Sequence, residues 1–164
     1  MATDLRFSSG TDELVRSRAT EMTGPTNFPP SWRRLALPIR TAILDGEVIV
    51  PGKRGFSDFH KLQEDLARGE SDRFLYYAFD LLYLDGMDLR AAPLIARKHA
   101  LESLISERSL PIIYSDHLDS EADLVQRRAC ELGYEGVVSK RRDAPYRSGE
   151  QDTWITCRPP SRLR

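Results

Sequence analysis

The run from Phe74 to Tyr83 constrains the fold of this chain more than any other part of its sequence. It is nearly continuous in aromatic and aliphatic residues. A strand with one face in water alternates apolar and polar residues, whereas a strand covered on both faces has no such alternation. Aromatic residues also favour extended backbone. We therefore predict a strand over 74–83 that crosses the middle of the core.

Apolar spacing, caps and turn formers predict the elements around this strand. Ser57 is a good N-cap for a helix over 58–68, and Gly69 is a good C-terminal stop. By the same signals we predict further helices over 95–107 and 120–132, and short strands over 112–114 and 136–140. Separated strands and helices of this kind indicate an α+β fold.

The stretch from Ala42 to Val50 contains two short β-rich runs broken by Asp45 and Gly46. One interpretation is a strand, a kink and a second strand. The other is an ordinary hairpin, because Asp-Gly is a common two-residue turn, in which case Glu47 merely faces solvent. The residues alone leave both open.

Bulk properties exclude several classes of protein. A hydrophobic content of 40% argues against a disordered chain, and a net charge of -1 gives no overall basic field. Cys130 and Cys157 are too few for a disulfide framework or a zinc site. No apolar run approaches the roughly 20 residues that span a bilayer. We expect no membrane association and a cytoplasmic location, with loosely ordered chain over 1–30, one domain over 31–158 and a tail over 159–164.

Five stretches occur in an order that resembles the ATP-dependent DNA ligases, especially the bacterial end-joining type. These enzymes belong to the wider group of lysine nucleotidyltransferases. The stretches are Leu44–Glu47 (Leu-Asp-Gly-Glu), Phe56–Phe59, Ala78–Leu84 (Ala-Phe-Asp-Leu-Leu-Tyr-Leu), Glu135–Lys140 (Glu-Gly-Val-Val-Ser-Lys), and Tyr146–Gly149 with Trp154 after it. The resemblance implies part of an ATP-grasp-like nucleotidyltransferase domain, with mostly antiparallel sheets flanked by helices.

The family's chemistry indicates what these residues would do. A lysine takes AMP from ATP, AMP passes to the 5′-phosphate of a DNA break, and the 3′-hydroxyl displaces it. Each step is a phosphoryl transfer that depends on positioning and charge neutralisation. The resemblance implies ATP and Mg²⁺ as cofactors, nicked or broken duplex DNA as partner, and a role in DNA repair and recombination by end joining.

The resemblance also assigns the candidate site residues. It implies Phe79 as the stacking platform for the purine, and Glu47 and Glu135 as carboxylates for metal and ribose. Lys140 and Arg158 would meet phosphate, with Arg141 and Arg147 as weaker candidates for that contact.

Structural roles compete with each of these assignments. By its sequence position alone, Phe79 is a core aromatic first, because its strand is apolar throughout, and arginines such as those of 141–147 most often form a solvated loop. Glu135 and Lys140 are five residues apart, so in a regular strand they point to opposite faces.

Two departures from the family pattern concern the chemistry directly. The family's nucleophile lies in a Lys-x-Asp-Gly motif upstream of the Leu-Asp-Gly-Glu strand, but the first lysine here is Lys53. Arginine cannot replace it, because a guanidinium stays protonated. Thr156 and Arg158 also stand where the family places two lysines. We therefore assign no catalytic residue.

A third departure is length, because the sequence stops at Arg164, where such ligases continue into an OB-fold domain. We expect a truncated ligase domain that does not adenylate itself. Two alternatives stay open. One is a non-catalytic module that binds nucleotides or DNA ends, and the other is one half of a split ligase completed by a second chain. RNA ligase or mRNA capping activity is a weaker enzymatic alternative.

Overall fold

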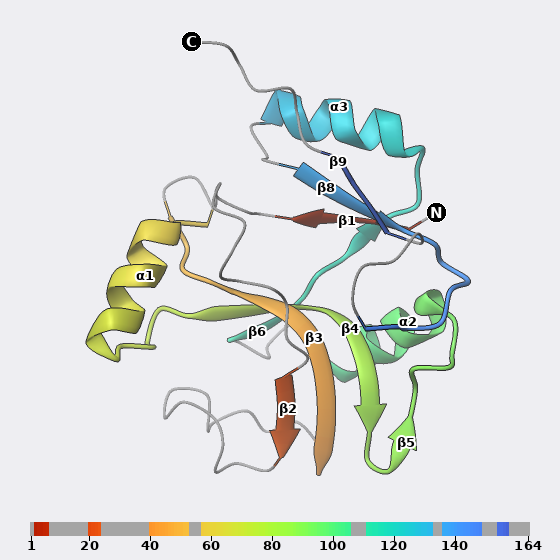
Figure 1. Cartoon of the computed structure of the whole chain (residues 1–164), viewed down its shortest axis with the longest axis horizontal. Coiled ribbons are helices and arrows are strands. Elements are labelled where there is room, and N and C mark those ends of the chain that lie inside the picture. The colour runs from red at the N-terminus through yellow and green to blue at the C-terminus, as the bar shows by residue number, and fades with distance from the viewer. Residues whose placement is uncertain are drawn as a thin grey trace.

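The computed structural model describes residues 2–6, 20–23, 40–52, 57–105, 111–132, 136–148 and 154–157 (Figure 1). The strands in these residues are β1 (Ala2–Arg6), β2 (Thr20–Thr23), β3 (Thr41–Ile49), β4 (Leu75–Leu84), β5 (Met87–Asp88), β6 (Ile112–Tyr114), β7 (His117–Leu118), β8 (Gly136–Lys140) and β9 (Trp154–Cys157). The helices are α1 (Phe59–Arg68), α2 (Leu94–Leu104) and α3 (Ala122–Leu132).

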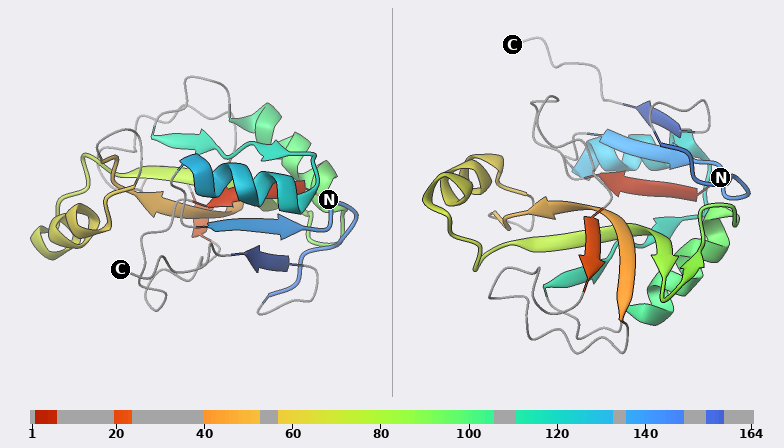
Figure 2. Two further views of the ribbon diagram at one scale, coloured as in Figure 1. Left: turned by 90° about the horizontal axis from the view of Figure 1, so that it is seen from above. Right: turned by 60° about the horizontal axis from the view of Figure 1, so that its bottom comes forward.

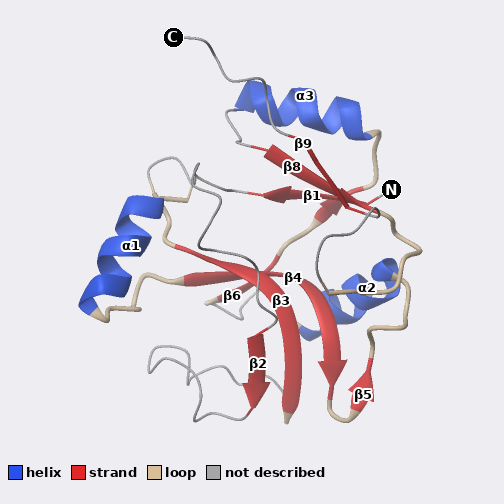
Figure 3. Ribbon diagram, viewed as in Figure 1, coloured by secondary structure: helices blue, strands red, loops and turns tan. Residues whose placement is uncertain are grey.

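The strands form two sheets (Figure 3). One has the order β7-β1-β8-β9, and the other has the order β2-β3-β4-β5 with β6 paired to β4. Among the described strands every ladder is antiparallel except β4 with β6. The predicted α+β fold of mostly antiparallel sheets flanked by helices is confirmed. The predicted central strand is confirmed as well, because β4 pairs with β3 along one edge and with β6 and β5 along the other.

Each sheet buries one face against helices. The larger core cluster joins β3 and β4 to α1, α2 and β6, and its buried members include Leu44, Leu62, Tyr76, Leu101 and Ile112. The smaller cluster joins α3 to β8. Seen from above, α3 overlies β1 and β8 (Figure 2). The two sheets therefore keep faces toward each other that the helices do not cover.

The helices follow the predicted pattern with shifted ends. α1 begins after Asp58, not Ser57, because the Asp58 carboxylate accepts a hydrogen bond from the backbone N–H of Lys61 at 3.1 Å. Gly69 ends the helix in the left-handed conformation, with φ of 69°. α2 stops at Leu104, earlier than predicted, because Ile105 is extended.

The Asp-Gly pair of β3 is not a hairpin turn. Asp45 and Gly46 lie inside a continuous strand that pairs with β4, and the pairing register shifts between them. Asp45 faces Asp80 while Gly46 faces Ala78, so Phe79 is an extra residue on the β4 side, which is a β-bulge. The interpretation as strand and kink is confirmed, and the hairpin interpretation is wrong.

Two strands lie in the N-terminal segment where we predicted none. β1 pairs with β7 and β8, and β2 pairs with β3, so strand pairing across the chain orders residues that have little apolar periodicity of their own. Within the described ranges, no helix is both long enough and apolar enough to cross a bilayer.

Candidate functional site

Phe79 and Lys140 meet where the two sheets face each other. The Nζ atom of Lys140 lies 4.2 Å from the centroid of the Phe79 ring. Only 1% of Lys140 and 5% of Phe79 is exposed. An ammonium group over an aromatic face at this distance is a favourable cation–π contact, worth about 0.5–2 kcal/mol. Two residues that were predicted to bind one ligand are therefore brought together from two sheets.

Strand alternation explains why Lys140 points at the other sheet. Val137 of β8 packs against Val125 and Ala129 of α3. Successive side chains of a strand point to opposite faces, so Val138 and Lys140 point away from α3. Both are buried. This face of β8 is the one that receives Phe79.

The same alternation directs the acidic residues of β3. Leu44 belongs to the larger core cluster, and Val48 packs against it. Asp45 and Glu47 therefore lie on the opposite face of β3, the face toward β8. Asp45 is buried, and Glu47 is half-buried opposite Tyr77 of β4. Glu47 is thus a partly accessible carboxylate rather than a solvent-facing turn residue.

Tyr146 links the loop after β8 to the acidic residues. Its phenol lies near the carboxylates of Asp45 and Asp80. Burial raises the pKa of Tyr146 above its usual value of 10.0, and the nearby carboxylates of Asp45 and Asp80 raise it further. The phenol therefore stays protonated, as a donor, through the neutral range. The Arg97 guanidinium lies 6.0 Å from the ring centroid.

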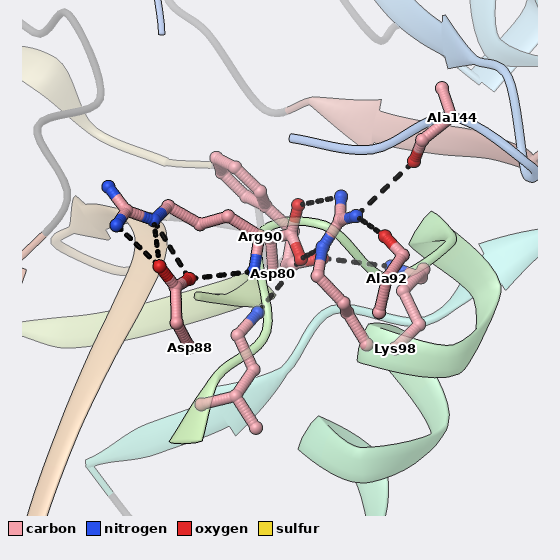
Figure 4. A network of polar contacts seen from close by, with 9 residues as sticks. Asp80, Asp88, Arg90, Ala92, Lys98 and Ala144 are labelled. Atoms are coloured by element: carbon pink, nitrogen blue, oxygen red, sulfur yellow. Dashed lines mark hydrogen bonds and ion pairs between the residues drawn. The ribbon is translucent and has the colours of Figure 1, made fainter. Parts of the chain in front are cut away.

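Asp80, beside Phe79, forms a buried ion pair with Arg97 of α2 (Figure 4). Arg97 Nε donates to Asp80 Oδ1 at 2.8 Å, and Arg97 Nη2 donates to Asp80 Oδ2 at 2.9 Å. The next residue, Lys98, donates through Nζ to the carbonyl oxygens of Phe79 at 3.3 Å and Ser115 at 3.0 Å. The bulge that carries Phe79 is therefore held from α2 by two adjacent cations.

The arginines of the loop after β8 are on the surface. Arg141 is exposed and donates to the Asp143 carboxylate, which raises the pKa of Arg141. Arg142 pairs with Asp119 at 2.6 Å. Arg147 is also exposed. Neither Arg141 nor Arg147 is brought to Phe79. Arg141 lies in a solvent-exposed loop, as the structural alternative expects.

Two predicted site residues, Glu135 and Arg158, lie outside the described residues. Within the residues that are described, no group of three or more His, Cys, Asp or Glu side chains is arranged to hold a metal ion.

Four residues of this region were given no role from the sequence: Asp45, Asp80, Arg97 and Tyr146. One signal was available for Asp80, because it is the single charge in the apolar run from Phe74 to Tyr83. A charge in such a run must be paired when the strand is buried.

Comparison with known proteins shows what the chain is similar to. Residues 16–157 match the family model described as "ATP dependent DNA ligase domain". The multifunctional non-homologous end joining protein LigD of Pseudomonas aeruginosa is 38% identical over 120 residues, which cover 73% of this chain and 14% of that protein. A DNA ligase of Natronomonas pharaonis is 34% identical over 127 residues, which cover 72% of this chain and 23% of that protein.

Solved structures agree with the sequence matches. A mycobacterial DNA ligase D complexed with ATP and MES aligns with a TM-score of 0.66 at 31% identity, covering 79% of this chain and 42% of that one. The ligase domain of Mycobacterium tuberculosis LigD aligns with a TM-score of 0.61 at 31% identity, covering 72% and 37%. The chain thus spans less than half the length of each relative named here.

Proposed function

Because this chain belongs to the ATP-dependent DNA ligase family, we propose that it carries the adenosine-binding part of a ligase adenylation domain. In this proposal the chain binds ATP without forming a covalent adenylate by itself. The observation that carries the proposal is the contact between Phe79 and Lys140 across the two sheets. It joins an aromatic face, which suits a purine, to a cation, which suits phosphate.

Binding would exchange one partner of the Phe79 ring for another. Stacking on an aromatic side chain is worth about 1–3 kcal/mol per base. The lysine stem is flexible, so the ammonium of Lys140 can leave the ring for the phosphates while the base takes its place. ATP would thereby supply a stacking contact for the ring and a phosphate contact for the ammonium in place of the cation–π contact.

Glu47 fits the second cofactor that the family implies. Mg²⁺ is usually held by one or two carboxylates together with water and substrate phosphates, so a full set of protein ligands is not required. Glu47 is half-buried on the face of β3 that is directed toward Lys140. We propose that Glu47 contributes an oxygen to the ion, with Glu135 as the second candidate.

The joining of DNA ends needs a nucleophile that we do not assign within this sequence. The chain has four lysines, Lys53, Lys61, Lys98 and Lys140, and all of them follow Glu47. Lys61 pairs with Asp58 at 3.0 Å in α1, and Lys98 is held by two carbonyls. We propose that the lysine comes from a segment outside this sequence, in a longer form of the protein or in a second chain, and that the complete assembly joins nicked or broken duplex DNA.

Replacing Phe79 by leucine tests the stacking role. We expect the affinity for ATP in the presence of Mg²⁺ to fall by about tenfold, because leucine keeps the apolar volume but loses the aromatic face. Titration calorimetry on the full chain measures this. Phe59→Leu is the matched control, since Phe59 packs partly buried against the larger core cluster at the start of α1. Equal affinities for ATP in the unmodified chain and in Phe79→Leu would refute the proposal.

A further inference from the structure

Two adjacent cations of α2 hold two consecutive residues of β4. Arg97 grips the Asp80 carboxylate at two points, and Lys98 donates to the carbonyl of Phe79. The backbone N–H of Leu81 also donates to Asp80, at 2.9 Å. The bulge at Phe79 is thus held at two places. Lys98 holds the backbone carbonyl of Phe79, and Arg97 holds the side-chain carboxylate of Asp80.

These charges are buried at a cost that stability alone does not explain. The exposed fractions are 3% for Arg97 and 0% for Lys98 and Asp80. Desolvating ions costs several kcal/mol each, and replacing a buried pair by apolar residues of similar volume is often neutral or stabilising. A buried ion pair does, however, specify geometry, because its hydrogen bonds accept one arrangement of donor and acceptor. Here the pair would fix the position of the bulge that carries Phe79.

Arg97 also joins the bulge to the loop that carries Tyr146. Its Nη1 atom donates to the carbonyl of Ala144 at 3.2 Å and to the carbonyl of Ala92. The backbone N–H of Leu94 donates to the same Ala144 carbonyl at 3.0 Å. One residue of α2 therefore connects the bulge and the loop on the two sides of the candidate site.

We infer that the buried Arg97–Asp80 pair, with Lys98, positions the Phe79 ring for the base of ATP, so that residues remote from the nucleotide set its affinity. The inference rests on the proposed function of Phe79. Arg97, Asp80 and Lys98 are positioning residues here, because they act through Phe79. The alternative is that the pair stabilises the fold and has no influence on base binding.

The test compares two ligands and two backgrounds. Asp80→Leu with Arg97→Met removes both charges together, so neither is left buried without its partner. The affinities for ATP and for inorganic tripolyphosphate are measured by calorimetry on the full chain, with and without Phe79→Leu. We expect ATP affinity to fall by about tenfold, which is about 1.4 kcal/mol, with tripolyphosphate affinity unchanged. In the Phe79→Leu background the double change should have no further effect, because the coupling runs through that ring.

A second variant covers the case in which the double variant does not fold, and a control pair tests whether the effect is specific to the buried site. Arg97→Lys retains the buried charge but loses the two-point grip, so it tests the same geometry if the double variant does not fold, and it should weaken ATP binding several-fold. Arg128→Gln with Glu131→Gln removes an exposed pair of α3, joined at 2.7 Å, and should change neither affinity.

Three results would overturn the inference. The double variant and Arg97→Lys could bind ATP as the unmodified chain does, they could lose ATP and tripolyphosphate affinity equally, or the loss could persist in full in the Phe79→Leu background. If the unmodified chain did not bind ATP, or bound it independently of Phe79, the proposed function and the inference would both fall. Phe79-dependent binding that survives the change at Asp80 and Arg97 overturns the inference alone.

Discussion

Replacing Asp80 by alanine is expected to lower the free energy of unfolding by about 3–5 kcal/mol. The change leaves the Arg97 guanidinium, which is 3% exposed, without the carboxylate that it contacts at 2.8 and 2.9 Å. An uncompensated charge in the core costs far more than the pair contributed, because its desolvation is no longer offset. Urea unfolding of the purified variant, analysed by linear extrapolation, measures the loss.

The Asp88–Arg90 pair provides a matched control for Asp80. Arg90 also contacts its carboxylate at two points, but the side chains are 50% and 62% exposed. The side-chain hydrogen bond from Arg90 lowers the pKa of Asp88 to about 2, so the pair persists through the neutral range. Solvent can replace the lost contact in Asp88→Ala, and we expect little change in stability. Equal losses in Asp80→Ala and Asp88→Ala would contradict the account of the buried pair.

Replacing Gly46 by alanine is expected to cost about 3 kcal/mol, the upper part of the usual range for overpacking a core. A Cβ atom at this position would lie 2.5 Å from the carbonyl oxygen of Tyr77 and 2.6 Å from the ring of Tyr76. The carbonyl belongs to the paired strand β4, so it cannot move without disturbing the ladder next to the bulge. Thermal or urea unfolding would detect the loss.

Gly69→Ala is the control for this change. It adds the same methyl group where nothing lies within 4 Å, so its only cost is the left-handed backbone, with φ of 69°. That strain is about 1–2 kcal/mol. A smaller loss in Gly46→Ala than in Gly69→Ala would mean that β3 and β4 separate more easily than their register indicates.

Local sequence signals predicted the elements better than their connections. Caps and apolar spacing gave the three helices to within a few residues, and the apolar run gave β4, because these signals act over a few neighbouring residues. The pairing of β3 with β4 depends on residues far apart in the sequence. An Asp-Gly pair forms a hairpin turn only when the two segments that flank it pair with each other. Here both flanking segments pair with β4, so the hairpin interpretation is wrong.

The candidate site was accessible from sequence only in part. Phe79 and Lys140 were identified through the resemblance of their two stretches to ligases, and the contact between them required the fold. Arg97 carried no signal of its own, because an arginine in a helix is ordinary, and Tyr146 lay in one of the five ligase-like stretches without a role of its own. The importance of Arg97 comes from its buried pairing with Asp80, and that of Tyr146 comes from its place near Asp45 and Asp80. Both depend on chain packing rather than on local pattern.

Mass spectrometry of the chain incubated with ATP and Mg²⁺, recorded under native and then denaturing conditions, tests whether the chain binds ATP without forming a covalent adenylate. We expect a one-to-one complex with ATP in the native spectrum and the unmodified protein mass after denaturation. A native spectrum without bound nucleotide would contradict the assignment of Phe79 and Lys140 as a nucleotide site. An adenylate that survives denaturation and is lost in acid would show that one of the four lysines is a nucleophile, contrary to the proposed function.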